Sequence, residues 1–172
     1  QGKALYVGIS KYPPAQAKIA YEMLRAAGVP CLISQYRYSM FDRTVEEKSL
    51  PLAAEQGSGF IAFSPLAQGL LTKKYLHGIP EHSRAARSTG FLKVDQVTED
   101  KVGKARRLDE IAARRGQTLA EMALAWVLKD ERMTSVIVGT SSVKQLADNL
   151  HALDNLNFTN EELAEIEGIL RL

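Results

Sequence analysis

The sequence has little of what marks a disulfide-stapled, membrane-spanning or nucleic-acid-binding protein. It holds one cysteine, Cys31, inside the apolar segment CLISQ, so an internal disulfide is excluded and we expect a small core residue in a cytoplasmic protein rather than a reactive thiol. The net charge at pH 7 is only +2, which argues against a nucleic-acid partner. No apolar run reaches the roughly 18 residues of a membrane span, and no basic region followed by an apolar one opens the sequence, so we expect neither membrane insertion nor targeting.

What the sequence does contain is an alternation of strand and helix patterns. With 172 residues, of which 45% are hydrophobic and 24% charged, it is typical of one soluble domain with a sizeable core. Two helices are predicted to end at Gly28 and Gly57, because glycine can take the left-handed conformation that closes a helix. The apolar runs show almost no polar alternation, which predicts a parallel sheet covered on both faces. The predicted strands are 4–9, 31–35, 58–63 and 135–139, and the first two helices are 15–28 and 46–57.

The alternation breaks at residues 72–97, where glycine, proline, histidine and basic residues follow no period. We predict a long surface loop there, which in a compact domain is more often functional than accidental, with disorder as the alternative. Helices are predicted to follow at 98–115, 118–130 and 160–171, and another begins near Ser142. The pairs with capping-box spacing are Thr118 with Glu121, Ser142 with Gln145 and Thr159 with Glu162, and Trp126 is assigned to core packing.

Four parallel strands fit either an open doubly wound sheet or part of an eight-stranded (β/α)8 TIM barrel. A complete barrel takes at least about 200 residues, so a chain of this length could supply only a portion of one. Barrels bind ligands at the carboxyl ends of their strands, and phosphate is commonly held by the loops after the last strands. The segment Gly139, Thr140, Ser141 and Ser142 is suited to that role, although the two serines could instead merely cap the next helix.

Five segments together resemble one protein family. They read GISKY at 8–12, SQYRYSMFDR at 34–43, FSPLAQGLLTKKY at 63–75, GIPEHSR at 78–84 and VGTSSVKQLADNL at 138–150. In this order and spacing they resemble the C-terminal half of an aldo-keto reductase, in the branch that holds bacterial glyceraldehyde 3-phosphate reductases and the β subunits of voltage-gated potassium channels. The resemblance implies an α/β fold, a (β/α)8 TIM barrel of which residues 1–172 supply strands five to eight and the cofactor-binding half.

The resemblance also implies a cofactor and a reaction. The cofactor is NADPH, and the full-length protein would be an enzyme that reduces a small aldehyde, such as glyceraldehyde 3-phosphate or methylglyoxal, by hydride transfer. Two alternatives stay open at this point. One is an NADPH-binding regulatory subunit of a membrane channel, and the other is a phosphate-binding barrel enzyme unrelated to redox chemistry.

Individual positions match the family's cofactor site. By that match Phe63 lies against the nicotinamide ring, and Ser10 and Gln35 hydrogen-bond its carboxamide. Lys74 and Arg84 approach the cofactor phosphates, where cationic side chains form charge-assisted bonds. For Phe63 the alternative is a core aromatic, and for the charged residues it is a solvated surface. The remaining matches are Ser64, Pro65 and Leu66 along the diphosphate, and Gly139, Ser141, Gln145, Asp148 and Asn149 at the adenosine end.

No catalytic residue and no metal ligand is assigned. The family's proton-donating tyrosine, with its lysine, histidine and aspartate partners, lies on the first four strands, which the resemblance places outside this chain, so we expect this chain alone to be inactive. Half a barrel would expose unpaired edges at 4–9 and 135–138, and we expect either the remaining strands or a second copy of the chain to close it. The histidines and two tyrosines near the expected pocket match none of these roles: His77, His82, His151, Tyr36 and Tyr38.

Overall fold

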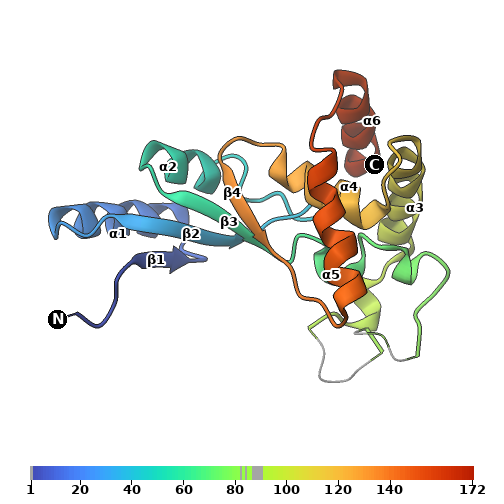
Figure 1. The fold of residues 1–172 in the computed structure, drawn as a ribbon, viewed down its shortest axis with the longest axis horizontal. Helices are drawn as coiled ribbons and strands as arrows, with labels where there is room; N and C mark the ends of the chain where they lie inside the picture. Colours follow the sequence, from blue (N-terminus) through green and yellow to red (C-terminus); the bar gives the residue numbers. More distant parts are fainter. Residues whose placement is uncertain (1, 82, 84, 87–90) are drawn as a thin grey trace.

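The computed structural model describes every residue of the chain except 1, 82, 84 and 87–90, and it shows an α/β arrangement (Figure 1). Four short 3-10 helices, η1 to η4, lie at Ala67–Gly69, Lys73–Tyr75, Val94–Gln96 and His151–Asp154. The strands are β1 Val7–Ser10, β2 Cys31–Arg37, β3 Gly59–Phe63 and β4 Met133–Ile137. The helices are α1 Pro14–Ala26, α2 Ser49–Glu55, α3 Glu99–Arg114, α4 Leu119–Leu128, α5 Val143–Leu150 and α6 Asn160–Arg171.

The four strands form one parallel sheet in the order β1-β2-β3-β4, which confirms the predicted strands and their direction. All carboxyl ends therefore lie at one edge of the sheet. One row of paired residues there runs through Ser10, Gln35, Ile61 and Ser135. The next row, closer to the carboxyl ends, runs through Arg37, Phe63 and Ile137.

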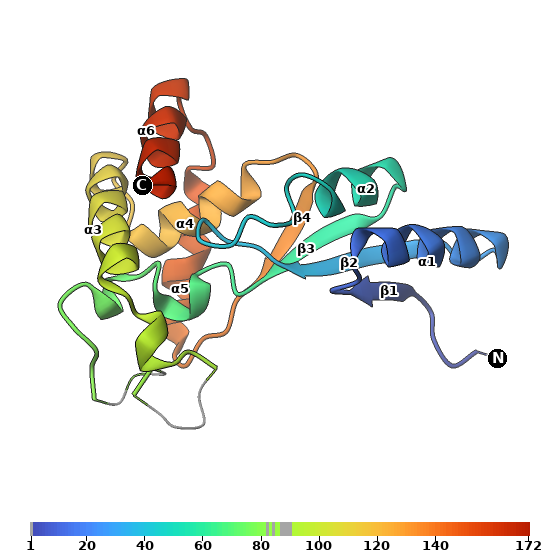
Figure 2. The same ribbon diagram turned by 180° about the vertical axis from the view of Figure 1, so that it is seen from behind.

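One face of the sheet is covered by helices. Packing joins α1 to β2, α2 to β3 and α4 to β4, while α3 packs against both α4 and α6 at one end of the molecule (Figure 2). Phe60 and Ala62 of β3 point into this layer and are fully buried. Burying such side chains stabilises the fold by about 1.5–3 kcal/mol for each large one. Trp126 and Cys31 are also buried, as predicted.

The opposite face, which we call the open face, carries the two rows named above. Gln35, Ile61 and Phe63 are half-buried on it, and Ile137 is 44% exposed. The prediction that both faces are covered is therefore wrong for the described chain. The open face mixes polar residues, such as Gln35, with apolar ones, such as Ile61 and Phe63, so the strands show no strict alternation that would reveal helices on one side only.

Several element boundaries differ from the predicted ones. β1 begins at Val7 rather than residue 4, and Leu5 before it is 90% exposed. α2 begins at Ser49 rather than residue 46, which agrees with Pro51 standing in its first turn, where a helix tolerates proline. Gly28 and Gly57 have φ of 72° and 68°, which confirms both predicted helix ends. The capping boxes of Thr118 with Glu121 and of Thr159 with Glu162 are confirmed.

The described part of segment 72–97 contains short helices and buried side chains that the predicted surface loop did not include. It contains η2 and η3, and Tyr75 and Leu92 from it are buried with Leu70 in a small apolar cluster. Arg106 of α3 donates two hydrogen bonds to the carbonyl oxygen of Leu76, at 2.9 and 2.7 Å, which ties the segment to the helical layer. These contacts join residues far apart in sequence, so local composition could not predict them.

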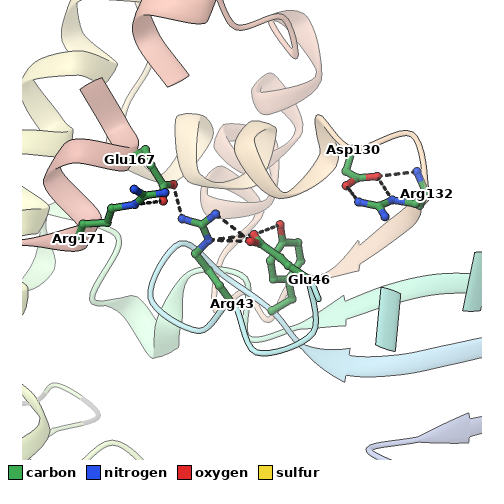
Figure 3. A network of polar contacts seen from close by, with 7 residues as sticks. Arg43, Glu46, Asp130, Arg132, Glu167 and Arg171 are labelled. Carbon is green, nitrogen blue, oxygen red and sulfur yellow. Dashed lines mark hydrogen bonds and ion pairs between the residues drawn. The ribbon is translucent and has the colours of Figure 1, made fainter. Parts of the chain in front are cut away.

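A polar network fastens the β2–α2 loop to α6 (Figure 3). The Arg43 guanidinium donates to both carboxylate oxygens of Glu46, at 2.8–3.0 Å, and to Glu167 of α6. Arg171 donates to the same Glu167 at 2.7 Å. The Arg43 guanidinium also lies 5.3 Å from the centre of the Trp126 ring. The C-terminal helix is thereby held against the segment that follows β2.

Candidate functional site

A cleft of about 400 Å³ lies at the carboxyl ends of β3 and β4. The lining comes from the loop that follows β3 and from the loop between β4 and α5. Figures 1 and 2 show that both loops leave the same end of the sheet. A cleft at the carboxyl edge of a parallel sheet is where α/β proteins commonly bind ligands. Its lining residues are Ser64, Pro65, Leu66, Gln68, Gly69, Thr72, Lys74, Ile137, Val138, Gly139, Thr140, Ser141 and Gln145.

The loop after β3 holds an unusual backbone. Ser64, Ala67 and Gln68 have φ of 54°, 46° and 61°, in the left-handed region that non-glycine residues rarely adopt. Each such residue costs on the order of 1 kcal/mol, and strain of this kind concentrates at functional sites. Gly69 has φ of 103°, and a Cβ there would lie 3.3 Å from the Tyr75 ring. The loop is thus a tight coil whose concave side forms one wall of the cleft.

The loop after β4 forms the opposite wall and leads into α5. The Gln145 side chain folds back toward Ser141. Its Oε1 accepts hydrogen bonds from the Ser141 backbone N–H at 2.9 Å and from the Ser141 hydroxyl at 3.2 Å. Ser142 caps α5 by accepting from the Gln145 N–H at 3.2 Å. The predicted capping box is therefore divided between two serines: Ser142 accepts, whereas the reciprocal contact of Gln145 goes to Ser141. Gly139 and Thr140 are exposed at the cleft.

Asp148 and Asn149 lie on α5 and do not line the cleft. Asp148 accepts from Lys144 at 2.9 and 3.0 Å, an exposed pair one helical turn apart that fits the surface interpretation. Asn149 is buried, at 9% exposed, and its side-chain nitrogen Nδ2 has no hydrogen-bond partner among the residues that the structure describes. An unpaired buried donor costs about 1–3 kcal/mol, so it is suited to a partner outside this chain.

Ser10, Gln35 and Phe63 lie on the open face, and Phe63 directly precedes Ser64, which lines the cleft. The Ser10 hydroxyl donates to the Gln35 side-chain oxygen at 3.2 Å across the paired strands. Phe63 is half-buried there, directly before Ser64, so it is not enclosed as a core aromatic would be. Its ring offers a flat apolar face one residue from the coiled loop. The predicted contacts of these three residues with a nicotinamide stay predictions.

The thirteen predicted site residues thus fall into distinct places. Three share the open face, two lie on α5 away from the cleft, and Arg84 lies outside the described residues. Five lining residues were missed: Gln68, Gly69, Thr72, Ile137 and Val138. The first three lie inside the motif FSPLAQGLLTKKY, so the motif itself was the signal that could have found them. The seven predicted residues that line the cleft are Ser64, Pro65, Leu66, Lys74, Gly139, Ser141 and Gln145.

The tyrosines near β2 point away from the site. Tyr36 is buried on the helix-covered face and donates to the Tyr12 carbonyl oxygen at 2.8 Å, and burial raises its pKa to about 12. Burial and the bond to Glu46 also raise the pKa of Tyr38, whose hydroxyl donates to that carboxylate at 2.8 Å. Both hydroxyls are engaged in the fold, so neither is placed to give a proton to a ligand on the open face.

The described part of the chain lacks two features, a metal-binding cluster and a membrane-spanning helix. Outside residues 1, 82, 84 and 87–90, no group of three or more histidine, cysteine, aspartate or glutamate side chains could hold a metal ion. Within the same residues, no helix has the length and apolar character needed to cross a membrane. The cleft is instead lined by hydroxyls, two side-chain amides, backbone and one ammonium group, and these donors fit a phosphate-bearing ligand.

Comparison with known proteins agrees with this arrangement. The chain is 48% identical over 170 residues to the L-glyceraldehyde 3-phosphate reductase of Escherichia coli O157:H7 and 46% identical to that of Escherichia coli strain K12. Each alignment covers 96% of this chain but 49% of the relative, so the chain spans about half the length of these proteins. The profile of the aldo/keto reductase family matches residues 1–171. This family has a (β/α)8 barrel fold, with which the four parallel strands agree, and the chain belongs to the aldo/keto reductase family.

Proposed function

We propose that this chain binds NADPH and forms the cofactor-binding part of a reductase that acts on small aldehydes of the glyceraldehyde 3-phosphate type. The observation that carries the proposal is the continuity between the open face and the cleft. Phe63 ends β3 on the open face, and the next residue, Ser64, opens the strained loop that lines the cleft. An extended ligand with an aromatic head and a phosphate-rich tail fits such a path.

In this proposal, the residues along the open face and the cleft each contact a different part of NADPH. Phe63 supports the flat face of the nicotinamide, and the Ser10 and Gln35 side chains, which already contact each other at 3.2 Å, fix its carboxamide. The loop from Ser64 to Leu66 follows the diphosphate, and Lys74 supplies positive charge. NADPH, when bound, supplies the hydride, and the residues of this chain bind and orient it so that one face of the ring is presented to substrate.

The far end of the cofactor is assigned to the loop after β4 and to α5. Ser141 and Gln145 line the cleft there, and the Nδ2 atom of Asn149 is a buried donor without a partner in the described chain. The adenosine portion carries acceptors that could satisfy that donor. No residue described in this chain is assigned to give a proton to the aldehyde oxygen, so the proposal places that step on a residue outside residues 1–172.

The test is reduction of aldehydes by the full-length gene product, followed as loss of NADPH absorbance. We expect turnover with glyceraldehyde 3-phosphate, and weaker turnover with methylglyoxal. NADPH binding without turnover of any aldehyde would overturn the reductase proposal and favour a nucleotide-binding regulatory protein. Absence of NADPH binding would overturn the cofactor assignment as well.

A further inference from the structure

A second, smaller cavity adjoins the cleft. It has a volume of about 170 Å³ and shares Ser64 and Gln68 with the cleft, so the two spaces are separated only by the coiled loop after β3. Its other walls come from the end of β2, the loop that follows β2, and the start of α3. A ligand that reached from the open face toward β2 would enter this cavity rather than the cleft proposed for the cofactor.

Arg37 lies where the cavity meets the open face. It is the last residue of β2, and its backbone is paired in register with Phe63. Its guanidinium carbon lies 6.0 Å from the centre of the Phe63 ring. If Phe63 supports the nicotinamide, Arg37 lies at the nicotinamide end of the cofactor and not at its phosphates.

The Arg37 guanidinium has N–H donors that no described residue of this chain accepts. Its ion pair with Asp42 joins Nε to Oδ2 at 3.9 Å, which is longer than a hydrogen bond, and its side chain is 53% exposed. Asp42 is itself held by the Thr44 hydroxyl at 2.9 Å. Asp42 therefore orients Arg37 from one side, and within the described chain the terminal nitrogens of Arg37 make no hydrogen bond.

A second cation lines the same cavity. Lys101, in the first turn of α3, lines the cavity and donates to the Gln96 carbonyl oxygen at 3.3 Å. The carboxylates nearest to it in sequence are engaged elsewhere, because Asp100 pairs with Lys104 at 3.0 Å and Glu99 with Arg106 at 3.1 Å. Asp42 is the acidic residue among the described residues that line the cavity. The cavity is therefore lined by two cations and one carboxylate, and this net positive charge favours the binding of an anion.

We infer that Arg37, supported by Lys101, holds the negatively charged group of the aldehyde substrate and makes the enzyme select phosphorylated or carboxylated aldehydes over neutral ones. This inference rests on the proposed function. A planar guanidinium can bind two oxygens of a phosphate or carboxylate at once, which a lysine cannot. The placement beside Phe63 sets a short distance between the anionic group and the reacting carbonyl, so the preferred substrates are short.

The test compares Arg37→Gln, Arg37→Lys and a control, Arg107→Gln, in the full-length gene product. Arg107 is exposed on α3 and lines neither cavity. The measured quantity is the ratio of kcat/KM for glyceraldehyde 3-phosphate to kcat/KM for glyceraldehyde, with succinate semialdehyde as a carboxylated substrate. We expect the ratio to fall about tenfold or more in Arg37→Gln, less in Arg37→Lys, and less than about twofold in Arg107→Gln.

Two results would overturn the inference. One is an equal loss of kcat/KM on neutral and anionic aldehydes, which would give Arg37 a structural role. The other is a weakening of NADPH binding by about tenfold in Arg37→Gln, which would place Arg37 on the cofactor. A loss confined to glyceraldehyde 3-phosphate or to succinate semialdehyde identifies which anionic group the cavity holds.

Titration with inorganic phosphate tests the anion site even if the proposed reductase activity is wrong. If the gene product reduces no aldehyde, the proposed function fails, and calorimetry of phosphate binding then decides the anion site alone. A dissociation constant about tenfold weaker in Arg37→Gln than in the unaltered protein would retain the site. Equal phosphate affinity in the two proteins would remove it.

Discussion

Lys74 carries the charge of the cleft, since the other cleft-lining residues in the described chain are polar or apolar but uncharged. If it contacts a cofactor phosphate, Lys74→Gln should weaken NADPH binding about tenfold, because a charge-assisted hydrogen bond contributes about 1.5–3 kcal/mol. Fluorescence titration with NADPH measures the effect. The matched control is Lys73→Gln, because the neighbouring ammonium group pairs with Asp109 at 3.6 Å and does not line the cleft. Equal weakening by both substitutions would argue for a general charge effect and against a contact.

A substitution at Asn149 should change the thermal stability of the protein and its affinity for NADPH in different ways. Replacing it by leucine removes a buried donor that has no partner among the described residues, and such replacements are nearly neutral or stabilising for the free protein. We therefore expect Asn149→Leu to leave the melting temperature unchanged or higher without nucleotide, and to weaken NADPH binding by about tenfold. A lower melting temperature with unchanged NADPH affinity would show that Asn149 serves only the fold.

Among the helices and loops, the ion pairs of Arg43 with Glu46 and Glu167 should contribute to the free energy of unfolding. Arg43→Met should lower the free energy of unfolding by about 1–3 kcal/mol at pH 7, because it leaves Glu46 and Glu167 without their shared cation in a half-buried setting. Urea denaturation of the full-length protein measures this loss. The control is Arg114→Met, since the pair of Arg114 with Glu165 is more exposed and worth at most about 1 kcal/mol.

The same network gives a pH dependence. The Arg43 guanidinium, assisted by Arg171, holds the pKa of the Glu167 carboxyl below its ordinary value. A carboxyl with a lowered folded pKa stabilises the protein above its unfolded pKa of about 4.3, and this contribution is lost as the pH falls through the folded value. The difference in stability between the unaltered protein and Arg43→Met should therefore shrink as the pH falls below about 4. A difference that stayed constant to lower pH would contradict the electrostatic origin.

Among the elements, the features predicted correctly from the sequence are helix ends and helix caps, which depend on only a few neighbouring residues. Glycine at 28 and 57 and the threonine caps of α4 and α6 are where they were expected, because φ preferences and capping bonds act over a few residues. The buried cluster under segment 72–97 was not predicted, since it depends on Leu70 and Arg106, which lie outside the segment. In the site, motif matching located Ser64 to Leu66, whereas Gln68 was missed although it belongs to the same motif, because its left-handed backbone could not be read from the sequence.

The whole molecule presents an open sheet face and two strand edges. β1 and β4 each have one neighbouring strand, and Ile137 on the open face is 44% exposed. Unpaired edges and exposed apolar faces promote association. The parallel order alone fitted either an open doubly wound sheet or part of a barrel, and the resemblance to the family is what favoured the barrel.

Residues 1–172 produced alone should accordingly associate rather than remain monomeric. Light scattering coupled to size exclusion would give a mass well above the 19.0 kDa of one chain. Ile137→Lys, which places a charge on the open face, should reduce the association, whereas Met23→Lys, at an exposed apolar position on α1, should not. A stable monomer of 19.0 kDa would show that the open face tolerates water.

The most direct test of the central claim is a crystal structure of the full-length gene product with NADP bound. The account predicts that the nicotinamide lies against Phe63, that the diphosphate follows Ser64 to Leu66, and that the adenosine end reaches the loop after β4 near Gln145. A nucleotide bound elsewhere, or bound in the cleft with its nicotinamide turned away from the open face, would contradict it.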